Sequence, residues 1–518
     1  MKLVQKFVEH NKALWQNGIN NNGQSIILLE LNKMCSAHIA YSYFANAMSL
    51  FSNSKLVAYD PYLCVRWRDC FIQNKRRLET ENEARVYRSF GVSEIIGIPR
   101  SRIRGIQARY IARKIYAQLF TKNDIEKIAI RGVKVGDLIY DSYLQKYRKP
   151  TIEIRTPDFF RFLAEVVDLF LFWERFFQQN KIAAINVSHC VYILAIPLRI
   201  AIHHGIPAFQ FNATHVYRLS KKNLFAYNDF FNFRTRFSQL PRLIKNRGLR
   251  KAKKQIQRRL NGEIGVDMSY SKKSAFGIPG NRRLLRSSAK KKVLIATHCF
   301  FDSPHSYGDN IFPDFYEWLE FLGGISKETN YDWYIKTHPD YLSGTMEVIE
   351  SFVRRYSNII LLPADSSHHQ IVSEGINLAL TVYGTIGFEY AMLGIPVINA
   401  SKNNPHIAYS FNLHAKSIKH YKKLLTDPQT FLHRPYKRDI YEYYFMKNIY
   451  NNENLFFKDY RKTVADLGGY DKQFSPDVYK IWLTEWSQKR HKKILKGIKN
   501  FILSSNYRME NKHLKQKI

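Results

Sequence analysis

The stretch over residues 378–400, LALTVYGTIGFEYAMLGIPVINA, decides the fold class of this chain. An apolar run is followed by a Tyr-Gly-Thr turn, a helical pattern over 386–393, a Gly-Ile-Pro turn and a second apolar run. Strand, helix and strand joined by short turns are typical of a parallel sheet with crossover helices. The small residues at the first turn predict that backbone amides and the Thr385 hydroxyl can approach a phosphate there. Glu389 lies one helical turn further, so we expect it to face the same ligand and to bind a ribose or a base amine.

The same strand–helix rhythm extends over most of the chain on both sides of this stretch. Residues 292–399 alternate short apolar runs with helical patterns, and residues 25–211 repeat the rhythm in the N-terminal half. Between them, residues 240–260 (LPRLIKNRGLRKAKKQIQRRL) are strongly basic and predict a solvated helix that leads into a linker. We therefore predict an α/β protein with two Rossmann-like domains and a C-terminal helical region. The predicted parts are 1–238, a basic segment and linker over 239–290, 291–430, and 431–518, which ends in a basic tail without a clear core face.

The composition limits the class of protein and its partners. The chain has 518 residues, 45% of them hydrophobic, which is enough for two or three domains with sizeable cores. Lys and Arg number 80 against 43 Asp and Glu, so the formal net charge is +37. Such an excess favours polyanionic partners: nucleic acid, an anionic membrane surface, or an acidic or nucleotide-linked substrate.

The cysteine pattern and the hydropathy indicate the compartment. The five cysteines have no Cys-x-x-Cys spacing, which argues against a disulfide framework or a zinc site and favours a reducing cytoplasm. The N-terminus lacks a secretory signal, and no apolar stretch reaches the roughly 20 residues of a membrane span. We expect a soluble or peripheral protein.

A second motif, Lys336-Thr337-His338-Pro339, follows a predicted strand over 332–335. Parallel sheets bind ligands where their strands end, and a Lys and a His two residues apart can both point into that crevice. Lys336 would supply a fixed charge, and His338 would hold a phosphate oxygen or protonate a departing one. Alone, this spacing more often marks a surface Lys and an ordinary strand-end His. Its occurrence about 45 residues before Thr385 makes a phosphate site the better interpretation.

Two further loops of the same predicted domain carry polar side chains. Ser366 and Ser367 follow a predicted strand and start a helix, where capping and donor contact are equally good explanations. His298, Ser303 and His305 lie in the first strand-to-helix loop, where contact with the phosphate or a sugar of the bound ligand is expected.

The N-terminal half offers candidates for a general base that would take a proton from an acceptor hydroxyl. Asp141 follows Asp137 by four residues near a glycine turn, and His189 and His215 each come shortly after an apolar run. For each one singly, a cap or a satisfied buried group is the more common role. His215 is the first choice because its loop can project from the sheet, and Asp141 is the second.

The two motifs together resemble a known family. The Lys-Thr-His-Pro run, followed by Gly-Thr-x-Gly-x-Glu-x-x-x-x-Gly-x-Pro, is similar to the capsule and surface polysaccharide glycosyltransferases. These enzymes have the GT-B fold, two Rossmann-like domains facing a cleft, and include bacterial Kdo transferases that use CMP-Kdo; polysialyltransferase-like enzymes are more distant. The resemblance implies that Lys336, His338 and Thr385 bind the donor phosphate and that Glu389 contacts ribose or base. Relatives often have Ser at the position of Thr385 and Lys-Pro-His-Pro in place of Lys-Thr-His-Pro.

The resemblance also implies partners and a place of action. We expect a nucleotide-sugar donor, a glycan or lipid-linked acceptor, and an anionic membrane surface at the cytoplasmic face of the inner membrane, reached through residues 240–260 and the tail after Lys489. No Asp-x-Asp occurs, so we expect metal-independent transfer without a cofactor.

Two alternatives stay open. The first is a teichoic-acid type phosphotransferase that uses a CDP-polyol, for which an Asp-Tyr-Ser-Ser-like segment would be expected at 383–386. The second is a basic nucleic-acid-binding protein, for which no recognition motif is present, so that nucleic acid is not the expected partner.

Overall fold

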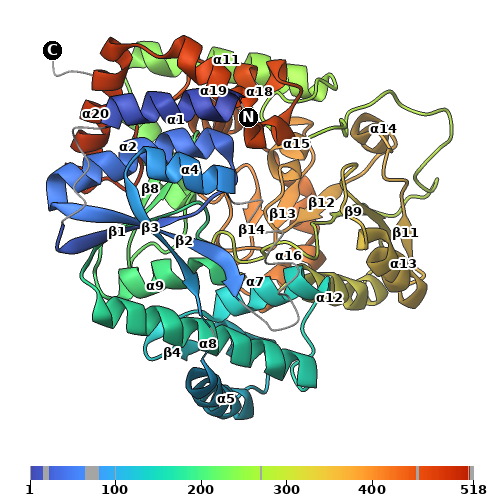
Figure 1. Ribbon diagram of the computed structural model, residues 1–518. Helices are drawn as coiled ribbons and strands as arrows, with labels where there is room; N and C mark the ends of the chain where they lie inside the picture. The colour runs from blue at the N-terminus through green and yellow to red at the C-terminus, as the bar shows by residue number, and fades with distance from the viewer. Residues whose placement is uncertain are drawn as a thin grey trace. The chain divides into compact units, whose positions relative to one another are not determined.

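The computed structural model describes residues 2–15, 23–64, 81–99, 101–268, 271–450, 454–510 and 513, with side chains left out over 61–64. The chain forms two compact units (Figure 1). Unit 1 comprises Met1–Tyr140, Ile154–Ala226 and Asn452–Ile518, and unit 2 comprises Asp141–Glu153 and Tyr227–Asn451. The prediction of an α/β chain with two Rossmann-like parts is confirmed.

Unit 1 is built on a six-stranded sheet in the order β3-β2-β1-β6-β7-β8. All neighbouring strands are parallel except β7 and β8, which are antiparallel. Strand β1 is buried along its whole length, as expected for a strand with helices on both faces of its sheet. The strands are β1 (Ser25–Glu30), β2 (Ser54–Cys64), β3 (Val92–Ile98), β6 (Ile182–Val187), β7 (Ala208–Phe211) and β8 (Val216–Leu219).

The helices of unit 1 come from both ends of the chain. Helix α2 is almost completely buried, and C-terminal α20 packs against it while α19 packs against α1 (Figure 1). The principal helices are α1 (Lys2–Trp15), α2 (Cys35–Ser52), α4 (Glu81–Ser89), α5 (Arg102–Ala117), α6 (Lys122–Glu126), α8 (Pro157–Gln179), α9 (Ile196–His203), α18 (Tyr460–Asp466), α19 (Asp477–Glu485) and α20 (Gln488–Leu503).

The C-terminal helices correct one expectation. The sequence predicted a separate region over 431–518 with a tail that lacks a core face, but Trp482, Ile498 and Phe501 are fully buried in the core of unit 1. The basic residues of α20 masked its apolar spacing, because Ile494, Ile498 and Phe501 recur at intervals of four and three residues and form one helical face.

Unit 2 repeats the sheet order of unit 1, as β11-β10-β9-β12-β13-β14, with every pair of neighbours parallel. The strands are β9 (Lys292–Ala296), β10 (Asp332–Lys336), β11 (Ile359–Leu361), β12 (Leu378–Thr381), β13 (Val397–Asn399) and β14 (Leu413–His414). The principal helices are α10 (Phe233–Ser238), α11 (Arg242–Leu260), α12 (Phe315–Glu328), α13 (Thr345–Arg355), α14 (His368–Ser373), α15 (Ile386–Met392), α16 (Ile418–Thr426) and α17 (Lys437–Tyr444). Helix α7 (Gly136–Tyr147) starts in unit 1 and ends in unit 2.

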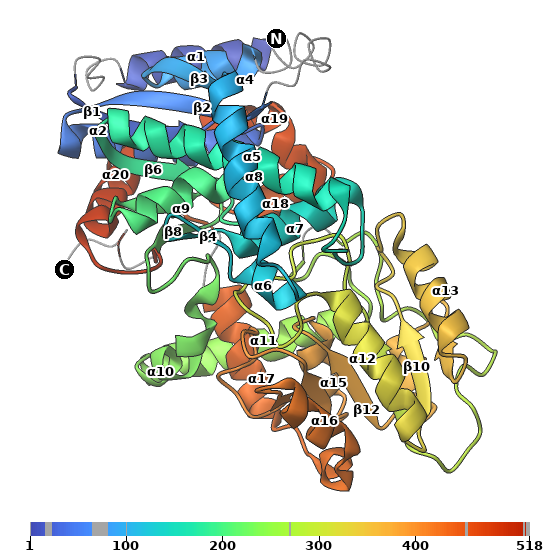
Figure 2. The same cartoon turned by 90° about the horizontal axis from the view of Figure 1, so that it is seen from below.

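The predicted basic helix exists as α11 and is a packed part of unit 2. It lies against α17 and the π-helical turn η5 (Phe445–Tyr450), with Ala252 and Ile256 fully buried (Figure 2). A Cβ at Gly248 would stand 2.5 Å from the Phe445 ring, so this glycine allows the close approach. The segment 239–290 is therefore a helix with a core face followed by an irregular stretch, and is more than a linker.

Candidate functional site

Both sheets have a topological switch point, where the strand order reverses direction. In unit 1 it lies between β1 and β6, and in unit 2 between β9 and β12. Ligands of open α/β sheets bind beyond the carboxyl ends of the strands at such a point. The candidate site residues are therefore those that follow these strands in each unit.

His298 follows β9 and fills the switch point of unit 2. Its Nε2 lies 3.0 Å from Thr381 Oγ1 and accepts the backbone N–H of Val382 at 3.2 Å. The ring stacks on Phe315 with centroids 4.6 Å apart. Burial lowers the pKa of His298 to about 3, with His338 as a smaller cause, so the imidazole is neutral. His298 thus joins the ends of β9 and β12, which makes it a structural part of the site floor.

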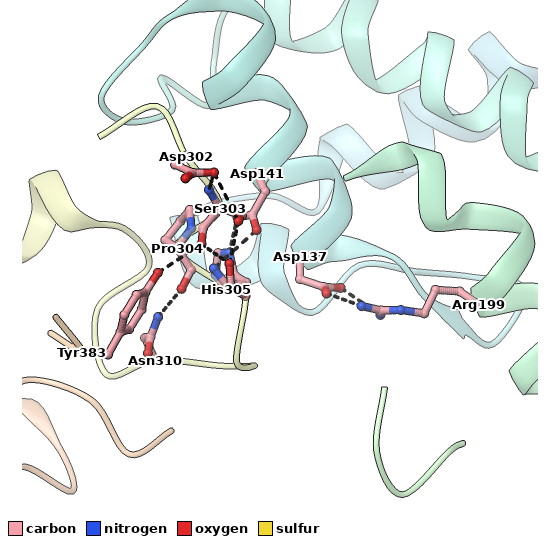
Figure 3. A network of polar contacts seen from close by, with 10 residues as sticks. Asp137, Asp141, Arg199, Asp302, Ser303, Pro304, His305, Asn310 and Tyr383 are labelled. Carbon is pink, nitrogen blue, oxygen red and sulfur yellow. Dashed lines mark hydrogen bonds and ion pairs between the residues drawn. The ribbon is translucent and has the colours of Figure 1, made fainter. Parts of the chain in front are cut away.

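The loop that follows His298 is held in place by Tyr383. The Tyr383 hydroxyl donates to the Ser303 carbonyl at 3.1 Å (Figure 3). The Tyr383 ring also packs against Tyr307, with centroids 5.1 Å apart. The Ser303 hydroxyl lies 2.6 Å from that of Ser306. The Ser303 hydroxyl therefore bonds within its own loop.

Lys336 ends β10 with only 2% of its side chain exposed. Its Nζ donates to the carbonyl oxygens of Ala364, at 2.9 Å, and Thr337, at 3.2 Å. Burial lowers the pKa of Lys336 to about 8, although the carboxylates of Asp365 and Glu389 act in the opposite direction. A buried ammonium group at the end of a parallel strand suits the binding of an anion.

Lys336 bonds to the carbonyls of Thr337 and Ala364, and a buried hydroxyl lies at or near each of these residues. Within the described part of the chain, Thr337 Oγ1 and Ser366 Oγ have no hydrogen-bond partner. Buried polar groups are normally paired, so these two hydroxyls are available to hydrogen-bond a ligand at this site. Ser367 stands at the N-cap position of α14, but its hydroxyl donates to the Gly277 carbonyl at 2.6 Å and makes no capping bond to the helix.

Glu389 is held by an arginine that the sequence prediction missed. Arg259, at the end of α11, donates from Nε to Glu389 Oε1 at 2.6 Å and also pairs with Asp267. Burial opposes the charge on Arg259, but these two carboxylates outweigh it and raise its pKa. Contact of Glu389 with a ribose or base stays a prediction; the structure shows a carboxylate that fixes Arg259.

His338 stands beside this cationic group and keeps contact with solvent. Its Nδ1 accepts the backbone N–H of Asp340 at 3.0 Å, so the loop fixes the ring. Surrounding protein lowers the pKa of His338, and the charges of Lys336 and Arg259 lower it further, against the effect of Asp340. The ring is therefore neutral at pH 7.

The turn before α15 and the first turn of α15 itself contain glycines that are needed for packing. Thr385 is half-buried and its side chain does not cap the helix. The Gly384 N–H donates to Thr381 Oγ1 at 3.2 Å. Within α15, a Cβ at Gly387 would stand 2.5 Å from the His406 ring, so a glycine is needed here for this ring to pack against the helix.

Asp141 and His305 form a buried pair within unit 2 (Figure 3). His305 Nδ1 lies 2.5 Å from Asp141 Oδ1, and the His305 backbone N–H donates to Asp141 Oδ2 at 3.3 Å. The sequence placed Asp141 on the acceptor side and His305 in the donor loop; the structure brings them together. The neighbouring carboxylate, Asp137, pairs instead with buried Arg199. A carboxylate at Nδ1 fixes the ring and makes Nε2 the basic nitrogen.

The switch point of unit 1 contains a carboxyl group that the sequence prediction missed. Glu30, the last residue of β1, accepts the backbone N–H of Ser188 at 2.8 Å and its hydroxyl at 2.6 Å. Burial raises the pKa of Glu30 to about 7, the bonds from Ser188 oppose this, and Asp60 adds to it. Its place at the end of an apolar run, SIILLE, was a usable signal.

His215 lies in unit 1, 6% exposed, with both ring nitrogens in internal contacts. Nε2 lies 2.7 Å from Asn212 Nδ2, and Nδ1 lies 2.9 Å from Thr214 Oγ1. Burial, followed by the charges of Arg508 and His189, lowers its pKa well below the ordinary value. This environment suits a structural histidine, and His215 as the base stays a prediction without geometric support.

Two kinds of feature are absent from the described residues. They contain no group of three or more His, Cys, Asp or Glu side chains that could hold a metal ion. None of their helices combines the length and apolarity of a membrane span. Metal-independent transfer stays a prediction.

Comparison with known proteins gave structural matches only. No family model and no curated protein matches the chain. The matching solved structures include the UDP-GlcNAc 2-epimerase of Neisseria meningitidis, 9% identical over 81% of this chain and 97% of the epimerase, with a TM-score of 0.22. A glycosyltransferase of Rickettsia africae is 10% identical over 92% and 99% of the two chains, TM-score 0.22. The wall teichoic acid polymerase TagF is 11% identical over 92% and 95%, TM-score 0.20. At TM-scores this low, these similarities say nothing about the function of the chain.

Proposed function

We propose that this protein is a metal-independent glycosyltransferase of bacterial surface polysaccharide synthesis. It moves a sugar from a nucleotide-activated donor, CMP linked to an acidic sugar of the Kdo class, to a glycan or glycolipid acceptor. The donor phosphate binds in unit 2 beyond the ends of β9, β10 and β12. Transfer takes place in the cytoplasm at the inner membrane face.

The observation that supports this proposal is the set of unsatisfied groups around Lys336. A buried ammonium with a lowered pKa, together with the unpaired hydroxyls of Thr337 and Ser366, offers one charge and two donors to a phosphate. Arg259 adds positive charge nearby, and the neutral His338 ring lies beside it. These groups neutralise the charge that develops on the leaving nucleotide, the role that a metal ion has in other transferases.

The Asp141–His305 pair is a second candidate for the base beside His215, because it has the carboxylate–imidazole arrangement of a general base. With Nδ1–H held by Asp141, Nε2 of His305 can take the proton of an acceptor hydroxyl, and the adjacent carboxylate stabilises the resulting imidazolium. Asp141 then positions His305 and does not itself accept the proton. Glu30 is less suited, because Ser188 occupies both of its carboxylate oxygens.

A thermal-shift panel of CMP, CDP, UDP and GDP tests the donor class. CMP at 100 times its dissociation constant is expected to stabilise the protein by about 2.7 kcal/mol. Lys336→Met should abolish this shift, whereas Lys402→Met, at an exposed site of the same unit, should leave it intact. Preference for CDP would favour polyol phosphate transfer, preference for UDP or GDP would reject the CMP donor, and no shift with any nucleotide would reject the site.

A further inference from the structure

Helix α5 of unit 1 carries an apolar stripe that nothing in the described structure covers. Ile103, Ile106 and Tyr110 are 82%, 68% and 59% exposed, and Phe120, just beyond the helix, is 77% exposed. Positions 103, 106 and 110 are spaced by three and four residues, so their side chains share one face of the helix. Single exposed apolar residues are common, but an aligned group marks a contact surface.

The opposite face of α5 is fixed to α8, so the stripe belongs to a rigid element (Figure 2). Ala108 and Ala112 are buried at this contact. Arg104 donates to the Asp168 carboxylate from Nε at 2.8 Å and from Nη2 at 3.0 Å. Within unit 1, α5 lies beyond α8 as seen from the sheet (Figure 1). The apolar face therefore points outward from a stably packed helix.

Positive charges border the stripe on both sides. Residues 101–123 contain six Lys or Arg and no Asp or Glu. By helical spacing, one edge of the stripe is bordered by Arg102, Arg109 and Arg113, and the other edge by Lys114. All four side chains are exposed. An apolar stripe bordered by cations is the pattern of a helix that lies in the interface of an anionic bilayer.

We propose that α5 docks the protein onto an anionic lipid surface, with Ile103, Ile106 and Tyr110 in the headgroup region and the flanking Arg and Lys on lipid phosphates. This surface is separate from the donor site and differs from the basic stretch at 240–260, in which α11 packs into unit 2. A second copy of the chain is a poorer occupant, because pairing two such faces would bring like charges together. Nucleic acid would use the cations but leaves the isoleucines without a role.

Vesicle co-sedimentation tests the proposal with the full-length protein. Wild type should bind phosphatidylglycerol-containing vesicles and bind pure phosphatidylcholine much more weakly. The triple variant Ile103→Ser/Ile106→Ser/Tyr110→Ser should weaken binding at least about tenfold, because it removes most of the inserted apolar surface. Arg109→Gln/Arg113→Gln should weaken it by about fivefold per charge and reduce its salt dependence.

Matched controls separate α5 from the general charge of the protein. Ile278→Ser changes an isoleucine that is 95% exposed in unit 2, and Lys251→Gln/Lys253→Gln/Lys254→Gln removes exposed charges from α11. Both should bind within about twofold of wild type. In Ile106→Trp, indole emission should shift to the blue on anionic vesicles, which reports insertion directly.

Four outcomes would overturn the proposal. The first is equal vesicle binding by wild type and the Ser variant, and the second is no vesicle binding by wild type. The third is loss of binding in the α11 variant alone. The fourth is that wild type binds single-stranded RNA and not vesicles, and that the Ser variant binds this RNA more weakly. None of these outcomes bears on nucleotide binding by unit 2.

Discussion

Lys336 couples the candidate donor site to pH. Its pKa of about 8 lies below the ordinary 10.5, so the ammonium loses its charge as the pH rises through 8. We expect the affinity for CMP to fall between pH 7 and pH 9, as measured by calorimetric titration. Arginine stays charged over this range, so Lys336→Arg should bind with little pH dependence. Identical pH profiles for the two proteins would show that another group titrates.

Glu30 should make the stability of unit 1 depend on pH. Its pKa of about 7 lies above the ordinary 4.5, so its stabilising contribution is complete below pH 4.5 and is lost as the pH rises through 7. Glu30→Gln should raise the free energy of unfolding at pH 8 by an amount on the order of 2 kcal/mol, with little change at pH 5. Urea unfolding at both pH values measures this. Glu94→Gln, exposed on β3 of the same unit, should change neither value, and a similar gain in both variants would contradict the assignment to Glu30.

The Asp141–His305 pair makes a kinetic prediction. His305→Asn and Asp141→Asn should each lower kcat by 10²-fold or more, as is typical for loss of general-base catalysis, and change CMP affinity by less than about twofold. His215→Gln is the control and should keep turnover within about threefold. A larger loss in His215→Gln than in His305→Asn would restore His215 as the base.

The grouping of candidate site residues was predictable where each residue follows a strand that the sequence itself indicates. Lys336 and His338 follow one strand, Thr385 follows another, and the carboxyl ends of parallel strands meet at one edge of a sheet. Arg259 was not predictable, because its position beside Glu389 depends on how α11 packs, 130 residues away in the chain. The Asp141–His305 contact spans 164 residues and was missed for the same reason.

At the scale of elements, two glycines in helices should respond in opposite directions to the same change. Gly248→Ala in α11 would place a methyl group 2.5 Å from the Phe445 ring, and we expect it to destabilise the protein by about 1–3 kcal/mol. At Gly105 in α5 an added methyl group would have no atom within 4 Å, so Gly105→Ala should stabilise by up to about 1 kcal/mol through helix propensity. Thermal unfolding of both variants gives the signs. Stabilisation by Gly248→Ala would mean that Phe445 moves freely.

Periodicity predicted the strand–helix alternation of both sheets but missed β3, β8 and β14, and the high charge of two helices led to wrong predictions of their burial. Helices α11 and α20 are so basic that their apolar faces were read as solvated, although Ile256 and Ile498 are fully buried. A stripe of three or four apolar residues is sufficient when the lysines and arginines on either side extend to water. The order of strands within each sheet lay outside what local patterns can predict, because it depends on contacts distant in sequence.

At the scale of the whole molecule, the last described helix is a structural part of the first unit. Phe501→Ala on α20 should lower the free energy of unfolding by about 3–5 kcal/mol, because the ring is completely buried among residues from the N-terminal half. Leu503→Ala, on the same helix and 69% exposed, should change stability by less than about 0.5 kcal/mol. Denaturant unfolding distinguishes the two. Equal, small effects would show that α20 is not part of the core.

The chain path of the two units has a consequence for biosynthesis. All of unit 2 precedes residue 452, whereas unit 1 needs both the first residues of the chain and the last. On the ribosome, unit 2 can therefore complete its sheet first, while the earlier-made unit 1 waits for α19 and α20 with α2 uncovered on one side. Until α19 and α20 have been synthesised, the nascent chain exposes the apolar surface of α2 to chaperones and to other nascent chains. A ribosome that stalls between residues 452 and 477 should therefore leave a folded second unit attached to an aggregation-prone first one.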